Sequence, residues 1–90
     1  MQTNGRHTVL VIDDNSVNLQ QLSAILRQEN YTVITCKTSE EALQLIQHQP
    51  PDIILLDVMM PGMDGFSLCR ILKQDELFSH IPIIFITSLS

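Results

Sequence analysis

Three aspartates stand directly after two apolar runs, at positions where parallel strands would end. Asp13 and Asp14 follow the run 9–12, and Asp57 follows the run 53–56. The carboxyl ends of parallel strands meet at one edge of a sheet, so we expect the three carboxylates to converge there. Crowded carboxylates repel one another unless a proton or a cation lies between them. A hard divalent cation such as Mg²⁺ prefers oxygen ligands and would remove this repulsion, so the spacing predicts a metal site.

The strands and helices that would position these aspartates alternate along the chain. Thr38 and Glu41 have the spacing of a capping box, and Asn15 is the expected N-cap of an earlier helix. A third helix is expected after the turn residues Asp64 and Gly65. The expected order is a strand at 8–12, a helix at 16–28, a strand at 32–35, a helix from 39 to before Pro50, a strand at 53–56, a helix at 66–75 and a strand at 82–86.

Near-continuous apolar strands that alternate with amphipathic helices indicate an α/β fold, with a doubly wound parallel sheet covered on both faces. Right-handed crossovers leave few arrangements, and we expect the strand order 2-1-3-4. This order places the first and third strands side by side, so the aspartates lie at the switch point where such folds bind ligands. The residues expected to face the core from the helices are Leu19, Leu22, Ile25, Leu26, Ala42, Leu43, Ile46, Leu68, Ile71 and Leu72.

The length, composition and net charge of the chain exclude several classes of protein. Ninety residues form at most one small domain, and a hydrophobic fraction of 44% is enough for a core. A net charge of -5 with five Lys and Arg argues against nucleic acid or an anionic membrane as a direct partner. No apolar run approaches the ~20 residues of a membrane span, and we do not expect the polar N-terminus to be a signal peptide. Cys36 and Cys69 are expected to be buried thiols in a reducing cytoplasm, with a disulfide or metal pair as the alternative.

The motifs around the aspartates resemble those of the receiver domain of bacterial two-component response regulators. Asp13-Asp14-Asn15, the segment 57–65 that contains Met60-Pro61-Gly62, and the strand that ends in Thr87 follow that family's order and spacing. The resemblance implies a flavodoxin-like fold over 8–90, after a short tail at 1–7. A receiver continues through two more helices and a fifth strand, so we expect a truncated receiver that lacks them.

The resemblance also implies a role for each matching residue. Asp57 matches the phosphoacceptor, whose carboxylate attacks phosphorus to form an aspartyl phosphate. Asp13 and Asp14 match the acidic pair that holds Mg²⁺ or Mn²⁺, Asp14 directly and Asp13 mostly through water. The backbone carbonyl of Met59 matches a further metal ligand, and Thr87 matches the hydroxyl that hydrogen-bonds a phosphoryl oxygen. The cation would bridge Asp57 to the incoming phosphoryl group and offset its charge.

Each of these residues also has an ordinary structural explanation. A single Asp after a strand is usually a turn or cap residue, and Asp64 is expected to cap the following helix rather than bind metal. Thr87 by itself would be a strand-end hydroxyl bonded to backbone. The set as a whole, rather than any one member, therefore predicts the site. Three histidines share no spacing and are expected at the surface: His7, His48 and His80.

Two residues of the receiver pattern have no counterpart in this sequence. The family's phosphoryl-binding lysine and its aromatic switch residue belong to the fifth strand. Lys37 and Lys73 are the lysines of this chain, and neither follows a strand in the place of that lysine, since Lys37 opens the second helix and Lys73 is late in the third. We therefore expect phosphorylation to change the shape of the protein little, because a ligand shifts a conformational equilibrium only through differential contacts.

Three functions are weighed. The leading one is a single-domain receiver that takes a phosphoryl group on Asp57 from a histidine kinase or phosphotransfer protein, without being a turnover enzyme. The alternative is a non-switching module that binds a kinase or another receiver. A phosphohydrolase of the haloacid-dehalogenase class is disfavoured, because Asn15 stands where its motif requires a second Asp. The apolar fourth strand would lie at the sheet edge, so we also expect a homodimer through that strand.

Overall fold

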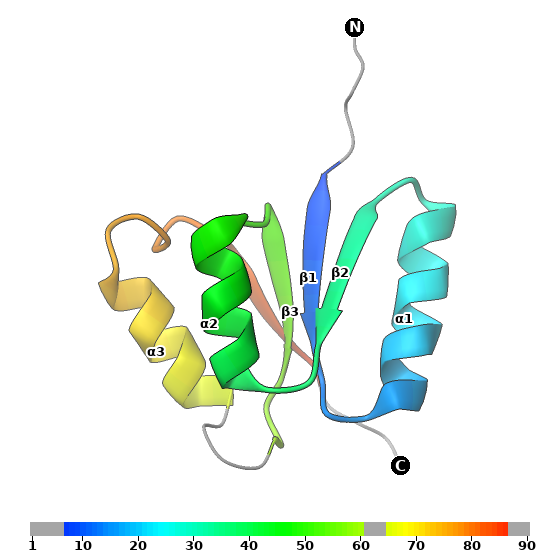
Figure 1. Cartoon of the computed structure of the whole chain (residues 1–90), viewed down its shortest axis with the longest axis horizontal. Helices are drawn as coiled ribbons and strands as arrows, with labels where there is room; N and C mark the ends of the chain where they lie inside the picture. Colours follow the sequence, from blue (N-terminus) through cyan, green and yellow to red (C-terminus); the bar gives the residue numbers. More distant parts are fainter. Residues whose placement is uncertain (1–6, 61–64, 87–90) are drawn as a thin grey trace, which may run out of the picture.

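A computed structural model describes residues 7–60 and 65–86 of the chain, and Figure 1 shows their arrangement. The strands form one parallel sheet with the order β2-β1-β3-β4, which confirms the predicted topology. The described residues form four strands and three helices. The elements are β1 (Thr8–Ile12), α1 (Ser16–Gln28), β2 (Thr32–Cys36), α2 (Ser39–His48), β3 (Ile53–Asp57), α3 (Gly65–Gln74) and β4 (Ile83–Ile86).

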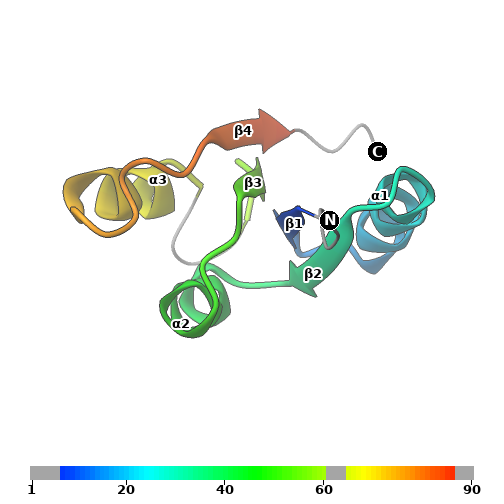
Figure 2. The ribbon, with the colours of Figure 1, turned by 90° about the horizontal axis from the view of Figure 1, so that it is seen from above.

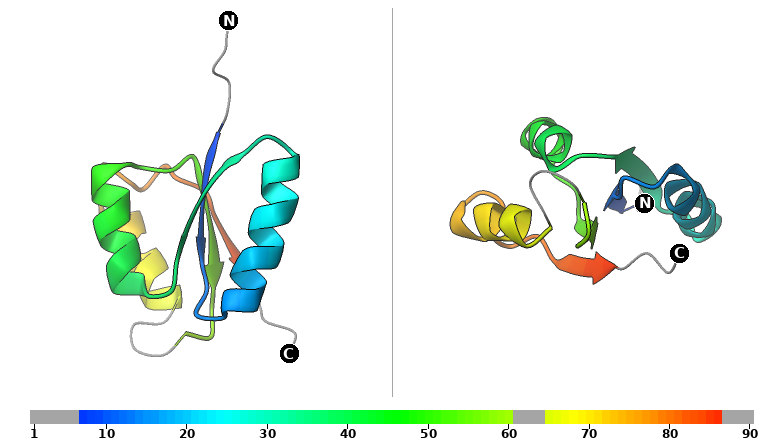
Figure 3. Two further views of the ribbon diagram at one scale, coloured as in Figure 1. Left: turned by 45° about the vertical axis from the view of Figure 1, so that its right-hand side comes forward. Right: turned by 90° about the horizontal axis from the view of Figure 1, so that it is seen from below.

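Helices cover both faces of the sheet. Figure 2 shows α1 on one face and α2 and α3 on the other, and Figure 3 shows the same layers from two further directions. Successive residues of a strand point to opposite faces, so Leu10 and Ile12 of β1 pack under α2 and α3, whereas Val9 and Val11 pack under α1. Both faces of the central strands are therefore covered, which explains why β1 is apolar from Val9 to Ile12 and β3 from Ile53 to Leu56.

Local hydrogen bonds confirm the two predicted N-caps. The Asn15 side chain accepts a hydrogen bond from the Asn18 N–H at 3.1 Å, and the Thr38 hydroxyl accepts one from the Glu41 N–H at 3.1 Å. The capping box differs from the prediction in one detail. The Glu41 carboxylate accepts from the N–H of Lys37, at 3.2 Å, rather than from that of Thr38. The acidic side chain thus stabilises the turn that precedes the helix.

Two of the predicted core positions are wrong. Ile25 is 58% exposed and Ile71 is 42% exposed, although both stand in apolar stretches. At 3.6 residues per turn, each lies about 110° around its helix from the centre of the buried stripe. On α1 the buried Ser23 faces the sheet instead, and on α3 the partly buried Cys69 packs against the core.

The fourth strand lies at the edge of the described sheet. β4 pairs with β3, with Leu55 opposite Ile84 and Leu56 opposite Phe85. Ile84 is 49% exposed and Phe85 is 39% exposed, and the Phe85 ring contacts the Phe66 ring of α3 at a centroid distance of 5.0 Å. This edge therefore presents apolar side chains to solvent. In the described part of the chain, no helix is long and apolar enough to cross a bilayer.

Candidate metal centre

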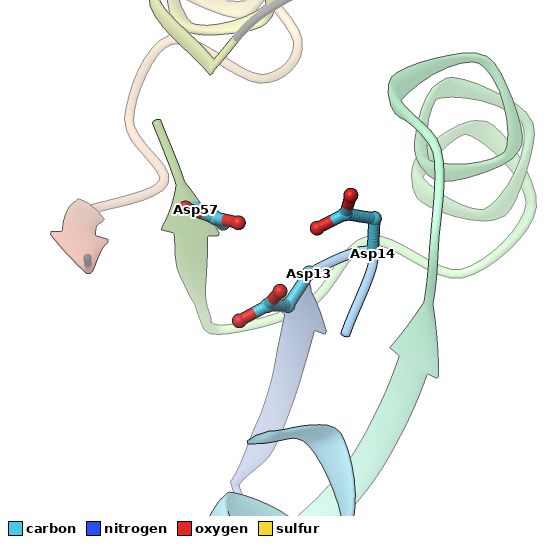
Figure 4. A group of neighbouring side chains, drawn as sticks. All are labelled: Asp13, Asp14 and Asp57. Atoms are coloured by element: carbon cyan, nitrogen blue, oxygen red, sulfur yellow. The ribbon is translucent and has the colours of Figure 1, made fainter. Parts of the chain in front are cut away.

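The fold brings the three aspartates together at the carboxyl edge of the sheet, between β1 and β3 (Figure 4). β1 pairs with β3 in parallel, with Ile12 opposite Leu56, so the residues that follow each strand lie side by side. One oxygen from each of Asp13, Asp14 and Asp57 lies within 4.8 Å of the other two. Asp13 and Asp57 are each 1% exposed, whereas Asp14 is exposed. The group therefore has a buried side and a side open to solvent.

Backbone and side-chain donors hold the two buried carboxylates. The Asp13 Oδ1 atom accepts a hydrogen bond from the Asn15 N–H at 2.9 Å, and its Oδ2 atom accepts one from the Asn18 amide at 3.2 Å. The Asp57 Oδ1 atom accepts a hydrogen bond from the Met59 N–H at 3.0 Å. Asn15 and Met59 directly follow the strand ends, whereas Asn18 lies in the first turn of α1. The strand ends and the start of α1 therefore orient the carboxylates together.

Burial raises the pKa of Asp57 above its ordinary value of 3.8. The negative charges of Asp13 and Asp14 and a hydrogen bond with Asp13 raise the pKa further, and the Met59 N–H lowers it in part. Among the described residues, the His7 ring lies 3.6 Å from the Asp52 carboxylate at the other edge of the sheet, where β1 and β3 begin, and no basic side chain pairs with the three aspartates. The site is therefore electrostatically unfavourable as it stands, and a cation would relieve it.

The donor set fits a hard divalent cation. All three side chains offer oxygen atoms, the ligands that Mg²⁺ and Mn²⁺ prefer. Two oxygens bound to one Mg²⁺ at about 2.1 Å lie no more than about 4.2 Å apart. The three carboxylate oxygens lie within 4.8 Å of one another, so a small side-chain movement, or one contact through water, would let all three bind the same cation. The exposed Asp14 leaves room for the waters that Mg²⁺ usually keeps.

Gly65, which the sequence suggested only as a turn residue, has a specific steric role beside Asp57. A Cβ atom at this position would lie 2.7 Å from the carbonyl oxygen of Asp57 and 3.0 Å from the Cα of Val58. The first residue of α3 therefore packs directly against the end of β3, and only a glycine permits this distance without a backbone shift. The position of Gly65 at a helix start, eight residues after the phosphoacceptor candidate, was the available signal.

The remaining predicted site residues are placed as follows. The Met59 side chain is 75% exposed, and its peptide adjoins Asp57 through the hydrogen bond described above. Thr87, Asp64 and the Pro61-Gly62 loop lie outside the described residues. The histidines at 7, 48 and 80 are exposed, as predicted.

In the described part of the chain, neither lysine forms an ion pair with the three aspartates. Lys37 follows β2 directly and precedes α2, and Lys73 lies at the end of α3 that is far from Gly65 and Asp57. The Lys73 ammonium group instead donates hydrogen bonds to the carbonyl oxygens of Ser79 at 3.0 Å and Ile81 at 2.9 Å. This lysine therefore holds the connection between α3 and β4.

The two cysteines are separate free thiols. Cys36 is buried as predicted, and burial, followed by the negative charge of Glu41, raises its pKa to about 12. Cys69 is only partly buried. The disulfide alternative is therefore not realised in this fold.

The family model and the most similar proteins that we found all point to the same family. A family model for the response regulator receiver domain matches residues 9–90. The chain is 51% identical over 81 residues to the response regulator PleD of Caulobacter vibrioides, covering 90% of this chain and 18% of that protein. It is 35% identical over 83 residues to the DNA-binding response regulator MtrA of Mycolicibacterium paratuberculosis, covering 92% and 36%. The chain thus spans about a fifth to a third of these relatives.

Solved structures agree with these matches. The Vibrio cholerae chemotaxis protein CheY4 superposes with a TM-score of 0.88 at 30% identity, covering 96% of this chain and 72% of that one. The N-terminal domain of a response regulator receiver protein from Methanoculleus marisnigri superposes with a TM-score of 0.85 at 34% identity, covering 88% and 64%.

Proposed function

Because this chain belongs to the response regulator receiver domain family, we propose that it receives a phosphoryl group on Asp57 from a histidine kinase or a phosphotransfer protein in the cytoplasm. The observation that carries the proposal is the cluster of three carboxylates within 4.8 Å at the switch point of the sheet. Two of them are buried without a basic partner among the described residues, an arrangement better suited to a cation and a phosphoryl group than to structure alone.

In this proposal, Asp14, Asp57 and the Met59 carbonyl hold Mg²⁺ or Mn²⁺, and Asp13 holds it mostly through water. The cation supplies positive charge that offsets the carboxylates and the phosphoryl oxygens. The Met59 N–H fixes Oδ1 of Asp57 and leaves the other oxygen to attack phosphorus. A bond forms between that oxygen and phosphorus as the bond from phosphorus to the donor breaks. The Thr87 hydroxyl then donates a hydrogen bond to a phosphoryl oxygen.

Metal binding is tested first by calorimetric titration of the chain with Mg²⁺ and Mn²⁺. Asp57→Ala and Asp14→Ala should each weaken binding at least tenfold, because each removes a ligand. Asp75→Ala is the matched control, since Asp75 is an exposed aspartate outside the cluster. Equal affinity in the wild type and both site variants would show that the ligands are assigned wrongly.

Phosphorylation is tested by mass spectrometry after treatment with a small phosphodonor and Mg²⁺. The chain should gain one phosphoryl group, and Asp57→Ala should gain none. The competing function is a module that binds a kinase or another receiver without phospho-signalling. That function would be supported by wild-type protein that binds such a partner but forms no acyl phosphate.

Amide NMR spectra before and after treatment with the phosphodonor measure how far phosphorylation changes the conformation of the protein. We expect changes near Asp57 and Thr87 and little change elsewhere, because a ligand shifts a conformational equilibrium only through differential contacts, and the contacts proposed for the phosphoryl group lie at the aspartate cluster and Thr87. Shifts that extend through α1 would contradict this.

Self-association through β4 is also proposed, because its edge presents apolar surface. Ile84 and Phe85 are 49% and 39% exposed on a strand that pairs on one side within the described sheet. Burying one such side chain contributes about 1.5–3 kcal/mol, so a two-fold contact could offset the cost of association. Light scattering at micromolar concentration should give a dimeric mass. A monomeric mass would refute the proposal, as would a dimer that persists after Ile84 and Ile86 are both changed to Lys.

A further inference from the structure

Asn18 lies on α1 but contacts the aspartate cluster directly. Its Nδ2 atom donates a hydrogen bond to Oδ2 of Asp13 at 3.2 Å, while its backbone N–H donates to the Asn15 side chain at 3.1 Å. The Asn15 N–H in turn donates to Oδ1 of Asp13 at 2.9 Å. Asp13, Asn15 and Asn18 are therefore linked by hydrogen bonds that join the end of β1 to the first turn of α1.

This network holds both oxygens of the Asp13 carboxylate. A carboxylate accepts hydrogen bonds and donates none, so the Asn18 amide must present its nitrogen, not its oxygen, to Asp13. One donor on each oxygen fixes the rotation of the carboxylate, and each oxygen keeps a lone pair for another contact. Asp13 is 1% exposed, so its orientation is set by these protein donors more than by bulk water.

We propose that Asn18 is a positioning residue for the metal centre, which holds the Asp13 carboxylate toward Asp14 and Asp57. The inference rests on the proposed function only in the identity of the cation. Groups that orient metal ligands from outside the ligand set typically change metal affinity by about 10–100-fold when they are removed. Asn18 has the same relation to Asp13, because it donates a hydrogen bond to the carboxylate, and the amide N–H that it presents there cannot bind a cation.

A purely structural role for Asn18 makes a different prediction. Asn has a lower helix propensity than Leu, so Asn18→Leu should leave the helix at least as stable. Asn18 is partly exposed, and it fills no core cavity among the clusters under α1. If Asn18 served only to support α1, Asn18→Leu would change at most the free energy of unfolding, and the affinity for Mg²⁺ would stay the same.

The test compares Asn18→Leu with Gln21→Leu, which makes the same change from amide to Leu at an exposed position of the same helix. Calorimetric titration with Mg²⁺ should give a dissociation constant at least tenfold higher for Asn18→Leu and one within twofold of wild type for Gln21→Leu. The rate of phosphorylation by a small donor should fall for Asn18→Leu at low Mg²⁺ and recover at saturating Mg²⁺. A loss that saturating Mg²⁺ does not restore would contradict a positioning role.

A second readout needs no metal. Scalar couplings of the Asp13 side chain in the metal-free protein should report one rotamer in the wild type and in Gln21→Leu, and averaged rotamers in Asn18→Leu. Wild-type protein that fails to bind Mg²⁺ would refute the proposed function, whereas these couplings would still decide the role of Asn18. An unchanged Asp13 rotamer or an unchanged Mg²⁺ affinity in Asn18→Leu would overturn the inference. If Asn18→Leu does not fold, Asn18→Ala takes its place in both measurements.

Discussion

Replacing Asp57 by Asn should stabilise the metal-free protein at neutral pH. Asp57 is 1% exposed, and as an ionised group it is desolvated and faces Asp13 and Asp14. Asn has nearly the same shape, and its Oδ1 atom can still accept the 3.0 Å hydrogen bond from the Met59 N–H. The substitution therefore removes a charge with little change in packing.

The geometry of the cluster gives the magnitude. Two unit charges at 4.8 Å, the outer limit of the cluster, repel by about 3.5 kcal/mol at an effective dielectric constant of about 20. Asp14 is exposed, so solvent and salt screen its part of the repulsion. We expect the free energy of unfolding of Asp57→Asn to exceed that of the wild type by about 1–3 kcal/mol. Each kcal/mol should raise the midpoint temperature of unfolding by about 4–8 °C.

The pH dependence has a definite sign. Burial, and then the neighbouring aspartates, raise the pKa of Asp57 in the folded protein above its ordinary value of 3.8. The folded chain keeps a proton that the unfolded chain has released, so wild-type stability falls as pH rises from the unfolded pKa through the folded pKa. Asn does not titrate. The stability advantage of Asp57→Asn should therefore grow as pH rises and disappear below about pH 4.

Urea unfolding in the presence of a chelator, repeated across this pH range, measures the effect. Asp75→Asn is the matched control, because Asp75 also accepts a hydrogen bond from the N–H two residues later, at 2.9 Å, but is exposed and outside the cluster. Added Mg²⁺ should stabilise the wild type by mass action and stabilise Asp57→Asn less. If Asp57→Asn is no more stable than the wild type at neutral pH, or if its advantage does not vary with pH, the Asp57 charge does not destabilise the folded protein.

Three further substitutions or measurements follow from the structure. Gly65→Ala should lower the free energy of unfolding, measured by urea titration, by about 1–2 kcal/mol, because a Cβ atom 2.7 Å from the Asp57 carbonyl oxygen costs more than the gain in helix propensity. A more stable variant would contradict this. Lys73→Met should lower it by about 1–2 kcal/mol through loss of two hydrogen bonds to backbone carbonyls, and Lys37→Met, the control, should change it little; equal effects would refute the assignment. Cys36, with its pKa raised to about 12, should react with a thiol reagent at pH 8 only after urea unfolding, as measured in a Cys69→Ser background; fast labelling of folded protein would contradict the burial.

The amino-acid sequence by itself was sufficient for the sheet and for the place of the acidic residues. Continuous apolar runs that end in Asp13 and Asp57 require strands buried on both faces, and parallel connection brings their carboxyl ends to one edge. The caps at Asn15 and Thr38 were predictable for a similar reason, because a cap involves residues within one turn of each other. Such features depend on local periodicity and on the chirality of the chain.

The tertiary structure decided the contacts between elements. Ile25 and Ile71 belong to apolar stretches, yet the rotation of each helix about its own axis, which packing sets, leaves them exposed. The approach of Gly65 to the Asp57 carbonyl and the bond from Asn18 to Asp13 depend on how α3 and α1 dock against the strand ends. Sequence spacing specifies which residues share a face of one element, but the distance between atoms of two elements depends on their packing, and the metal centre is built from such distances.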